Sequence, residues 1–146
     1  MSQTQAMSLD EIYQLAFDTL LSAGADEHNA TILASVLVNA ERDGSHSHGL
    51  FRLPAYVAGL KSKKINGCAR AEVTQVTSSF IRVDGNRGLA PTAHDAAIPA
   101  LVKAAQKTGV AIAAIHRCFH MAALWPEVEA IACLLYTSDA ADDVRG

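Results

Sequence analysis

Four of the six histidines of this 146-residue chain lie in two short clusters. The first cluster, residues 43–52, brings together Ser47, His48 and Arg52. An imidazole can donate or accept a proton near neutral pH, and a guanidinium can hold a carboxylate through two parallel hydrogen bonds. If helical geometry begins at Gly49, Arg52 lies about one turn beyond His48. These residue types suit proton transfer to a carboxylate substrate. A solvated linker, whose serines cap the next helix, fits the same composition.

The second cluster, His116 to His120, directly follows a continuous apolar run of strand length at 110–115. A strand end that opens into a helix is a common ligand site in α/β proteins, and a helix N-terminus binds phosphate through its unpaired amides. His116, Cys118 and His120 alternate, so they could also face one metal ion. Because no paired cysteines or carboxylates stand at an established ligand spacing, the sequence predicts no bound metal.

Three helices are predicted to position the first cluster, because apolar residues recur there at helical spacing. Ser8 and Glu11 have the spacing of a capping box, in which two side chains satisfy the first backbone donors of a helix. Glycine is the usual left-handed helix stop, and basic residues suit a helix C-terminus. On these signals, the boundaries are expected at Ser8 and Gly24, at Asp26 and Gly44, and at Leu53 or Pro54 and the basic residues Lys61, Lys63 and Lys64.

The hydrophobic pattern changes in the second half of the chain. Residues 72–77 and 80–83 alternate polar with apolar side chains, which predicts two strands, and residues 91–108 again have a helical pattern. The apolar run at 110–115 is predicted to form a strand buried on both faces. A last helix is expected over 122–132. The fold class is therefore α/β (α+β), with a helical N-terminal portion followed by a sheet that looks incomplete.

Composition excludes several classes of protein. Half of the residues are hydrophobic and only 18% are charged, so the chain can bury a core and is not intrinsically disordered. The formal net charge of −3 argues against a partner such as nucleic acid or an anionic membrane surface. No apolar stretch is long enough to span a membrane. The three cysteines are widely spaced and form no disulfide framework, which indicates a cytoplasmic protein.

Missing motifs exclude further classes. The chain has no GxGxxG after a predicted strand, no GxxxxGK[ST], no HExxH and no GxSxG. A Rossmann dehydrogenase, a nucleotidase, a zinc protease and an α/β-hydrolase are therefore all disfavoured.

One long segment carries a family resemblance. Residues 39–56, Asn-Ala-Glu-Arg-Asp-Gly-Ser-His-Ser-His-Gly-Leu-Phe-Arg-Leu-Pro-Ala-Tyr, resemble the signature of the non-Rossmann malate/L-lactate dehydrogenase family. Val83-Asp84-Gly85, the segment 107–110 and His120 follow in the order found in that family. Residues 120–129 are similar to the subgroup of Δ1-piperideine-2-carboxylate/Δ1-pyrroline-2-carboxylate reductases, although Pro126 stands where subgroup members can have a hydrogen-bonding substrate contact.

The resemblance implies a role for each matching residue. Ser47 would belong to a proton relay, His48 would protonate the substrate as hydride arrives, and Arg52 would hold the substrate carboxylate. The nicotinamide-cofactor site would be lined by five consecutive residues, His120, Met121, Ala122, Ala123 and Leu124. The resemblance also implies NADP or NAD as cofactor, a small-molecule carboxylate as substrate and a homodimer. An Asp that completes the relay would lie beyond the end of this chain.

These inferences lead to one expected function with two alternatives. The expected function is NAD(P)H-dependent reduction of cyclic ketimine 2-carboxylates to L-pipecolate or L-proline. The first alternative is a malate, L-lactate or ureidoglycolate type of 2-hydroxy-acid dehydrogenase in the same family. The second, from a different class, is a helical interaction module whose histidines bind a metal.

Three segments are expected along the chain. Residues 1–67 would form the helical portion with the Ser-His-Gly segment, and residues 68–132 the beginning of an NAD(P)-binding α/β domain. Residues 133–142, Cys-Leu-Leu-Tyr-Thr-Ser-Asp-Ala-Ala-Asp, resemble a translated sequencing adapter, so 133–146 are expected to be non-native. The chain as it stands is accordingly expected to be truncated and inactive.

Overall fold

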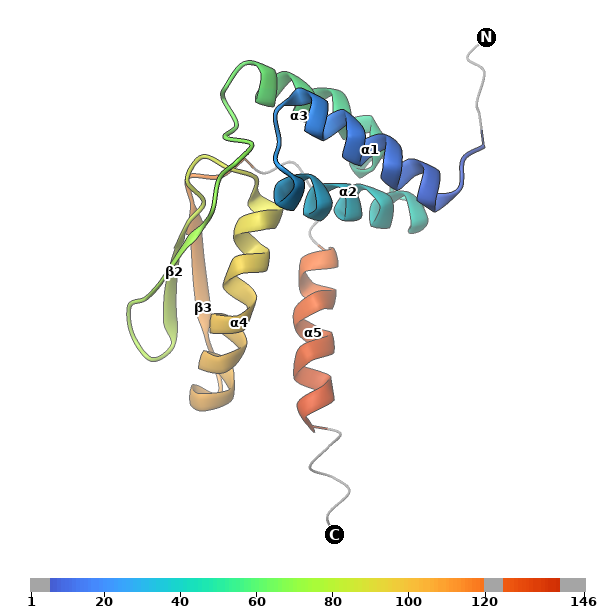
Figure 1. Ribbon diagram of the computed structural model, residues 1–146. Helices are drawn as coiled ribbons and strands as arrows, with labels where there is room; N and C mark the ends of the chain where they lie inside the picture. The colour runs from blue at the N-terminus through green and yellow to red at the C-terminus, as the bar shows by residue number, and fades with distance from the viewer. Residues whose placement is uncertain (1–5, 120–124, 140–146) are drawn as a thin grey trace. The chain divides into compact units, whose positions relative to one another are not determined.

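The computed structural model of the chain describes residues 6–119 and 125–139 (Figure 1). The chain divides into two compact units, Met1–Cys68 and Ala69–Gly146. The first unit is helical, and the second combines helices with a mixed β-sheet. This arrangement confirms the predicted fold class.

The first helix, α1 (Leu9–Ala23), has both of its predicted ends. The Ser8 hydroxyl accepts a hydrogen bond from the Glu11 N–H at 3.2 Å, and the Glu11 carboxylate accepts one from the Ser8 N–H at 2.7 Å. The bonds from the Ser8 backbone and hydroxyl lower the pKa of Glu11. Gly24 ends the helix in the left-handed region, with a φ of 107°. The capping signals in the sequence were therefore sufficient here.

The second helix, α2 (Glu27–Arg42), packs against α1 and leads into the first histidine cluster. Asp26 is its N-cap, as predicted, because its carboxylate accepts a backbone N–H of the first turn. The predicted stop at Gly44 is confirmed, because this glycine directly follows the C-cap Asp43 and adopts the left-handed conformation that ends a helix. Gly44 lies in the following turn with a φ of 72°, and the next residue, Ser45, donates its N–H to the Ala40 carbonyl at 2.8 Å.

The third helix, α3 (Leu53–Lys61), begins where it was predicted to begin. It ends before most of the predicted basic patch, because Ser62 is its C-cap and Lys63 has a φ of 60°. A left-handed residue cannot continue an α-helix. The buried face of α3 consists of Leu53, Tyr56, Gly59 and Leu60.

The second unit contains a three-stranded sheet in the order β1-β2-β3, formed by Glu72–Gln75, Phe80–Asp84 and Ile112–His116. β1 and β2 are antiparallel, whereas β2 and β3 are parallel and are connected by α4 (Ala90–Thr108). Figure 1 shows α4 along one face of this sheet. The buried core of the unit lies between them and consists of Ile81, Val83, Ala93, Ala97 and Ala104.

The prediction that residues 110–115 form a strand buried on both faces is wrong. In β3 only Ala113 and Ile115 pack against the core under α4, and Ile112 on the opposite face is 60% exposed. Within the described residues β3 is an edge strand that pairs with β2 alone. A run of consecutive apolar residues shows that both faces can be covered, but it does not supply the second covering layer.

The last helix, α5 (Trp125–Asp139), contacts α4. It extends past the predicted end at 132, and residues 122–124 of the predicted helix lie outside the described residues. In the part of the chain that the structure describes, no helix is both long and apolar enough to cross a membrane.

Candidate active site

The first histidine cluster folds into two short 3-10 turns between α2 and α3. The turns are η1 (His46–His48) and η2 (Leu50–Arg52), and we call residues 45–52 the histidine loop. Gly49 separates the two turns with a backbone that is not helical, at a φ of −87° and a ψ of −135°. The expectation that helical geometry begins at Gly49 is therefore wrong. His48 and Arg52 belong to two different turns joined at one residue.

The structure brings Ser47 and His48 together as the sequence predicts. His48 Nδ1 lies 3.0 Å from Ser47 Oγ and 3.3 Å from Ser45 Oγ. When a hydroxyl donates to Nδ1, the neutral imidazole carries its own proton on Nε2. Each serine hydroxyl can also accept the proton of Nδ1–H, so these contacts are compatible with either tautomer of His48. Ser45 was not predicted for this role, although its spacing of three residues from His48 matches one turn of a 3-10 helix.

Arg52 folds back onto the turn that holds the other two residues. Its Nε donates to the backbone carbonyl of Ser47 at 2.8 Å, and its side chain is half-buried. A guanidinium has five N–H donors, and Nε uses one of them, so the terminal nitrogens offer the fork that suits a carboxylate. Ser47, His48 and Arg52 consequently form one continuous group, with a base or acid beside an anion-binding side chain.

Tyr56 lies one turn after Arg52 in α3. Its side chain is 1% exposed, and among the described residues its hydroxyl has no hydrogen-bond partner. Burial raises the pKa of Tyr56 to about 12, while the positive charge of Arg52 acts in the opposite direction. The phenol therefore stays protonated at neutral pH and at moderately alkaline pH.

Glu41 in α2 also contacts the histidine loop, which sequence reasoning missed. Its Oε1 accepts the Leu50 N–H at 2.7 Å, and its Oε2 lies 2.5 Å from His46 Nδ1. The charge of Glu41 and its position near the end of a helix predict only a solvated residue. Its spacing of nine residues from Leu50 belongs to no regular element, so no periodic pattern indicates the contact.

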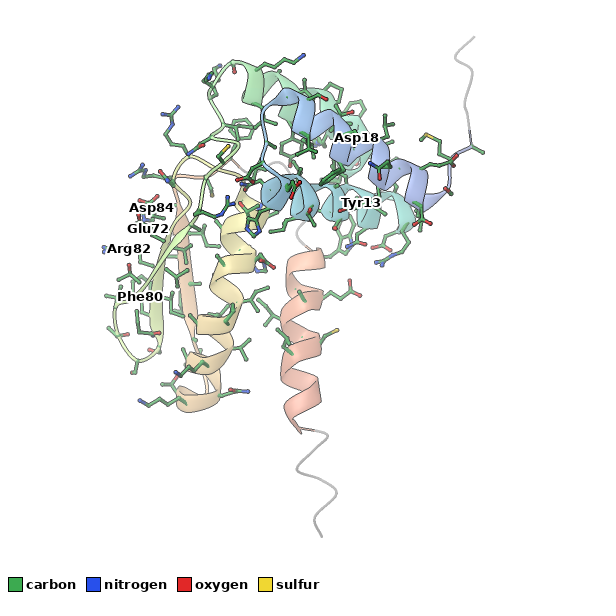
Figure 2. All side chains as sticks on the ribbon, viewed as in Figure 1. Tyr13, Asp18, Glu72, Phe80, Arg82 and Asp84 are labelled. Carbon is green, nitrogen blue, oxygen red and sulfur yellow. The ribbon has the colours of Figure 1, made fainter. Side chains whose placement is uncertain are left out.

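The second predicted cluster is only partly described. His116 ends β3, whereas all five residues predicted to line a cofactor site, 120–124, lie outside the described residues. His116 and four polar side chains line a shallow cavity of about 220 Å³, namely Glu72, Thr74, Arg82 and Asp84. Figure 2 shows Glu72, Arg82 and Asp84 together at the sheet.

A cation beside this cavity is already paired, because Arg117 Nη1 lies 3.1 Å from Asp84 Oδ2. Among the described side chains, no three potential metal ligands are grouped so that they could hold an ion. His120, one of the three residues considered for a metal, is not among them.

The histidine loop lies in the part of the chain that matches a known protein family. The family described as malate/L-lactate dehydrogenase matches residues 7–133. The chain belongs to this family. The family resemblance predicted from residues 39–56 is therefore confirmed.

Two curated relatives of this family member are reductases of cyclic imine carboxylates. The Δ1-pyrroline-2-carboxylate reductase of Ancylobacter novellus is 41% identical over 129 residues, which are 88% of this chain and 38% of the relative. The Δ1-pyrroline-2-carboxylate/Δ1-piperideine-2-carboxylate reductase of Pseudomonas putida is 45% identical over 109 residues, or 75% of this chain and 32% of the relative. The chain thus spans about a third to two-fifths of the length of these relatives.

Solved structures confirm the family fold. The Δ1-piperideine-2-carboxylate reductase of Pseudomonas syringae pv. tomato has a TM-score of 0.83 at 41% identity, over 87% of this chain and 38% of its own. A malate dehydrogenase from Entamoeba histolytica has a TM-score of 0.73 at 28% identity, over 81% of this chain and 33% of its own. The fold is therefore shared by relatives named for imine substrates and by relatives named for 2-hydroxy acids.

Proposed function

We propose that the protein to which this chain belongs reduces cyclic imine 2-carboxylates, with NADPH or NADH as hydride source. The substrates would be Δ1-piperideine-2-carboxylate and Δ1-pyrroline-2-carboxylate, and the products L-pipecolate and L-proline. The observation that carries the proposal is the histidine loop, in which Ser47, His48 and Arg52 contact one another in succession. The names of the relatives support the choice of an imine substrate.

Arg52 would bind the substrate carboxylate through its terminal nitrogens. Its Nε bond to the Ser47 carbonyl fixes the guanidinium against the turn that carries His48. Binding the carboxylate would therefore also place the adjacent C=N bond at a fixed position relative to the imidazole. Orientation of this kind lowers the barrier because the reacting groups no longer have to find each other.

His48 would supply the proton. The hydroxyls of Ser45 and Ser47 contact Nδ1, so the proton given to the imine nitrogen would leave from Nε2. As hydride reaches C2 of the substrate, the C=N π electrons move to nitrogen, and nitrogen takes this proton. The Ser47 hydroxyl would give its proton to Nδ1 as the Nε2 proton leaves, and would itself be reprotonated by the next member of the relay, the Asp expected beyond this chain.

The nicotinamide cofactor would supply the hydride. The histidine loop fits such a cofactor, because it provides an anion clamp and a proton donor but no hydride donor of its own. The residues proposed to hold the cofactor are 120–124. The experiment below compares NADPH with NADH to determine which cofactor is used.

Reduction of a 2-oxo acid is the second candidate. The structural likeness to the malate dehydrogenase of Entamoeba histolytica favours it. The same loop would serve this reaction, since a ketone oxygen beside a carboxylate also needs a clamp and a proton. In that case the product would be a 2-hydroxy acid of the malate, L-lactate or ureidoglycolate type.

We extend the proposal to the organisation of the protein. The first unit would present the substrate-binding loop, and the second unit would begin the cofactor-binding domain. The whole protein would be a cytoplasmic homodimer, which sedimentation analysis would test. The 146-residue chain would not reduce imines, because it spans only part of the length of its relatives.

The test uses a hybrid reductase, made of residues 1–132 of this chain followed by the remaining C-terminal part of the Pseudomonas syringae pv. tomato reductase. Oxidation of NADPH and of NADH is followed with both cyclic imines and with pyruvate and oxaloacetate. Faster turnover of the imines is expected, and the 146-residue chain is expected to be inactive. A preference for 2-oxo acids would overturn the proposal in favour of the second candidate. Absence of turnover with every substrate would overturn both.

A further inference from the structure

Gly49 forms the joint between the two turns of the histidine loop, and the position of one turn relative to the other depends on contacts that hold this joint in place. His48 is the last residue of η1 and Arg52 is the last residue of η2. The backbone torsion angles of Gly49, which lies between the turns, therefore set the relative orientation of the two side chains. The Nε bond of Arg52 to Ser47 closes the loop on one side. A second contact on the other side comes from α2.

The carboxylate of Glu41 provides that second contact. Its side chain is 14% exposed, and Oε1 accepts the N–H of Leu50, the first residue of η2, at 2.7 Å. A hydrogen bond from a backbone amide to a charged carboxylate is stronger than one between neutral groups. The other oxygen meets His46, the first residue of η1, whose side chain is 75% exposed. One carboxylate therefore contacts both turns, with the more buried bond made to η2.

Gly49 is shaped to admit this carboxylate. A Cβ atom at Gly49 would lie only 2.5 Å from Glu41 Cδ and 2.7 Å from Glu41 Cγ, which is far inside van der Waals contact. Gly49 is also buried. The absence of a side chain at this position is thus matched to the presence of Glu41, and the carboxylate lies directly against the backbone that joins the two turns.

We propose that Glu41 is a positioning residue for the reaction: it braces the joint at Gly49 and so sets the position of His48 relative to Arg52. This inference rests on the proposed function, because it assigns the purpose of the brace to the proton donor and the carboxylate clamp. Glu41 touches neither substrate nor cofactor in this role. It acts through the backbone of Leu50.

The first measurement separates the brace from catalysis. Hydrogen exchange of the Leu50 amide is measured in the 146-residue chain and in its Glu41→Ala and Glu41→Gln variants. Glutamine keeps an oxygen at the Oε1 position, so Leu50 protection is expected to persist in Glu41→Gln and to be lost in Glu41→Ala. Glu27→Gln, the same change at an exposed position of α2, is the control and should leave Leu50 unchanged. Unchanged Leu50 protection in Glu41→Ala would overturn the proposal.

The second measurement is kinetic, in the hybrid reductase. Glu41→Ala is expected to lower kcat/KM by about tenfold to a hundredfold, because a small displacement of catalytic groups has an effect of that size. Glu41→Gln is expected to restore most of the loss, which a general need for a negative charge would not allow. Wild-type kinetics in Glu41→Ala, with Leu50 protection lost, would overturn the positioning role and leave the proposed function intact. An inactive wild-type hybrid would instead overturn the proposed function and the catalytic purpose of the brace together.

A third variant tests the same contact with the Glu41 side chain retained, which keeps the proposal testable if Glu41→Ala misfolds. Gly49→Ala places a methyl group in the space of the Glu41 carboxylate and should lower kcat/KM to a similar extent. Combined with Glu41→Ala, it should cost little more, because the methyl group then has room; contacting residues are expected to be non-additive in this way. Full additivity of the two losses would overturn the proposed contact as the cause.

Discussion

The histidine loop and the three-stranded sheet are stabilised by different kinds of interaction. The loop is held by directional hydrogen bonds in which the side chains of Glu41, Ser45 and Arg52 take part. The sheet is held by its ladders and by Ile81 and Val83, which are fully buried under α4. A hydrogen bond depends on where one atom lies, whereas apolar burial depends mainly on area and volume. Changes of single atoms should therefore affect the loop, and changes of volume should affect the sheet.

The largest effect is expected from removing His48, the proposed proton donor in the loop. In the hybrid reductase, His48→Ala should lower kcat by about a hundredfold to ten-thousandfold, which is the usual contribution of a general acid. Substrate affinity should change little, since Arg52 is retained. Stopped-flow measurement of cofactor oxidation would give the chemical step directly. If kcat stays at the wild-type value, His48 is not the acid.

The sheet should respond to volume instead. Ile81→Ala removes a fully buried side chain and should lower the free energy of unfolding by about 2–5 kcal/mol. Ile112→Ala removes the same atoms at a position that is 60% exposed, and should change it by about 0.5 kcal/mol or less. Urea denaturation of the 146-residue chain measures both. Equal effects of the two variants would show that the outer face of β3 is covered in solution.

A smaller effect is expected from replacing Arg52, the proposed carboxylate clamp. In the hybrid reductase, Arg52→Ala should raise KM by about tenfold to a hundredfold, because a hydrogen bond to a charged group is worth about 1.5–3 kcal/mol. Arg52→Lys keeps the charge but loses the planar fork and should recover only part of the affinity. An unchanged KM together with a reduced kcat would assign Arg52 to the chemical step rather than to binding.

The smallest effect at neutral pH is expected from Tyr56, a buried residue of α3. Its pKa is raised to about 12 by burial, whereas an unfolded tyrosine ionises near its ordinary value of 10.0. The unfolded chain thus loses this proton first, so the stability contributed by Tyr56 is fully present below pH 10.0 and is lost as the pH rises towards 12. Alkaline denaturation followed by tyrosinate absorbance would measure this. In Tyr56→Phe the stability should fall less steeply over that range, and an identical slope in both proteins would contradict the assignment.

The sequence predicted those features that depend on neighbouring residues. The capping pair of Ser8 and Glu11 and the stops at Gly24 and Gly44 each rest on a rule about one helix end, and each is confirmed. Ser47, His48 and Arg52 could be selected by residue type because their chemistry is rare in a connector. Their contacts with one another could not be derived from helical spacing, because Gly49 is not helical and divides the segment into two separate 3-10 turns.

Features that depend on a second layer of structure were missed. The apolar run that includes Ile112 was predicted to be buried on both faces, yet a sequence pattern does not reveal how many layers cover a strand. Glu41 was missed for a related reason. Its partner Leu50 is fixed by the path of an irregular loop, and only coordinates show that the absence of a Cβ at Gly49 leaves space for a carboxylate.

The hydrogen bonds of the histidine loop join residues that are close in the sequence, and this affects the order of folding. The bond between Glu41 and Leu50 closes a segment of nine residues, whereas the pair of Asp84 and Arg117 joins residues 33 apart. The entropy lost on closing a loop grows with its length, and contacts between distant residues slow folding. The histidine loop can therefore take shape together with the ends of α2 and α3, before the parallel strands have met. A nascent chain would form the histidine loop, with the proposed proton donor and carboxylate clamp, before it forms the sheet.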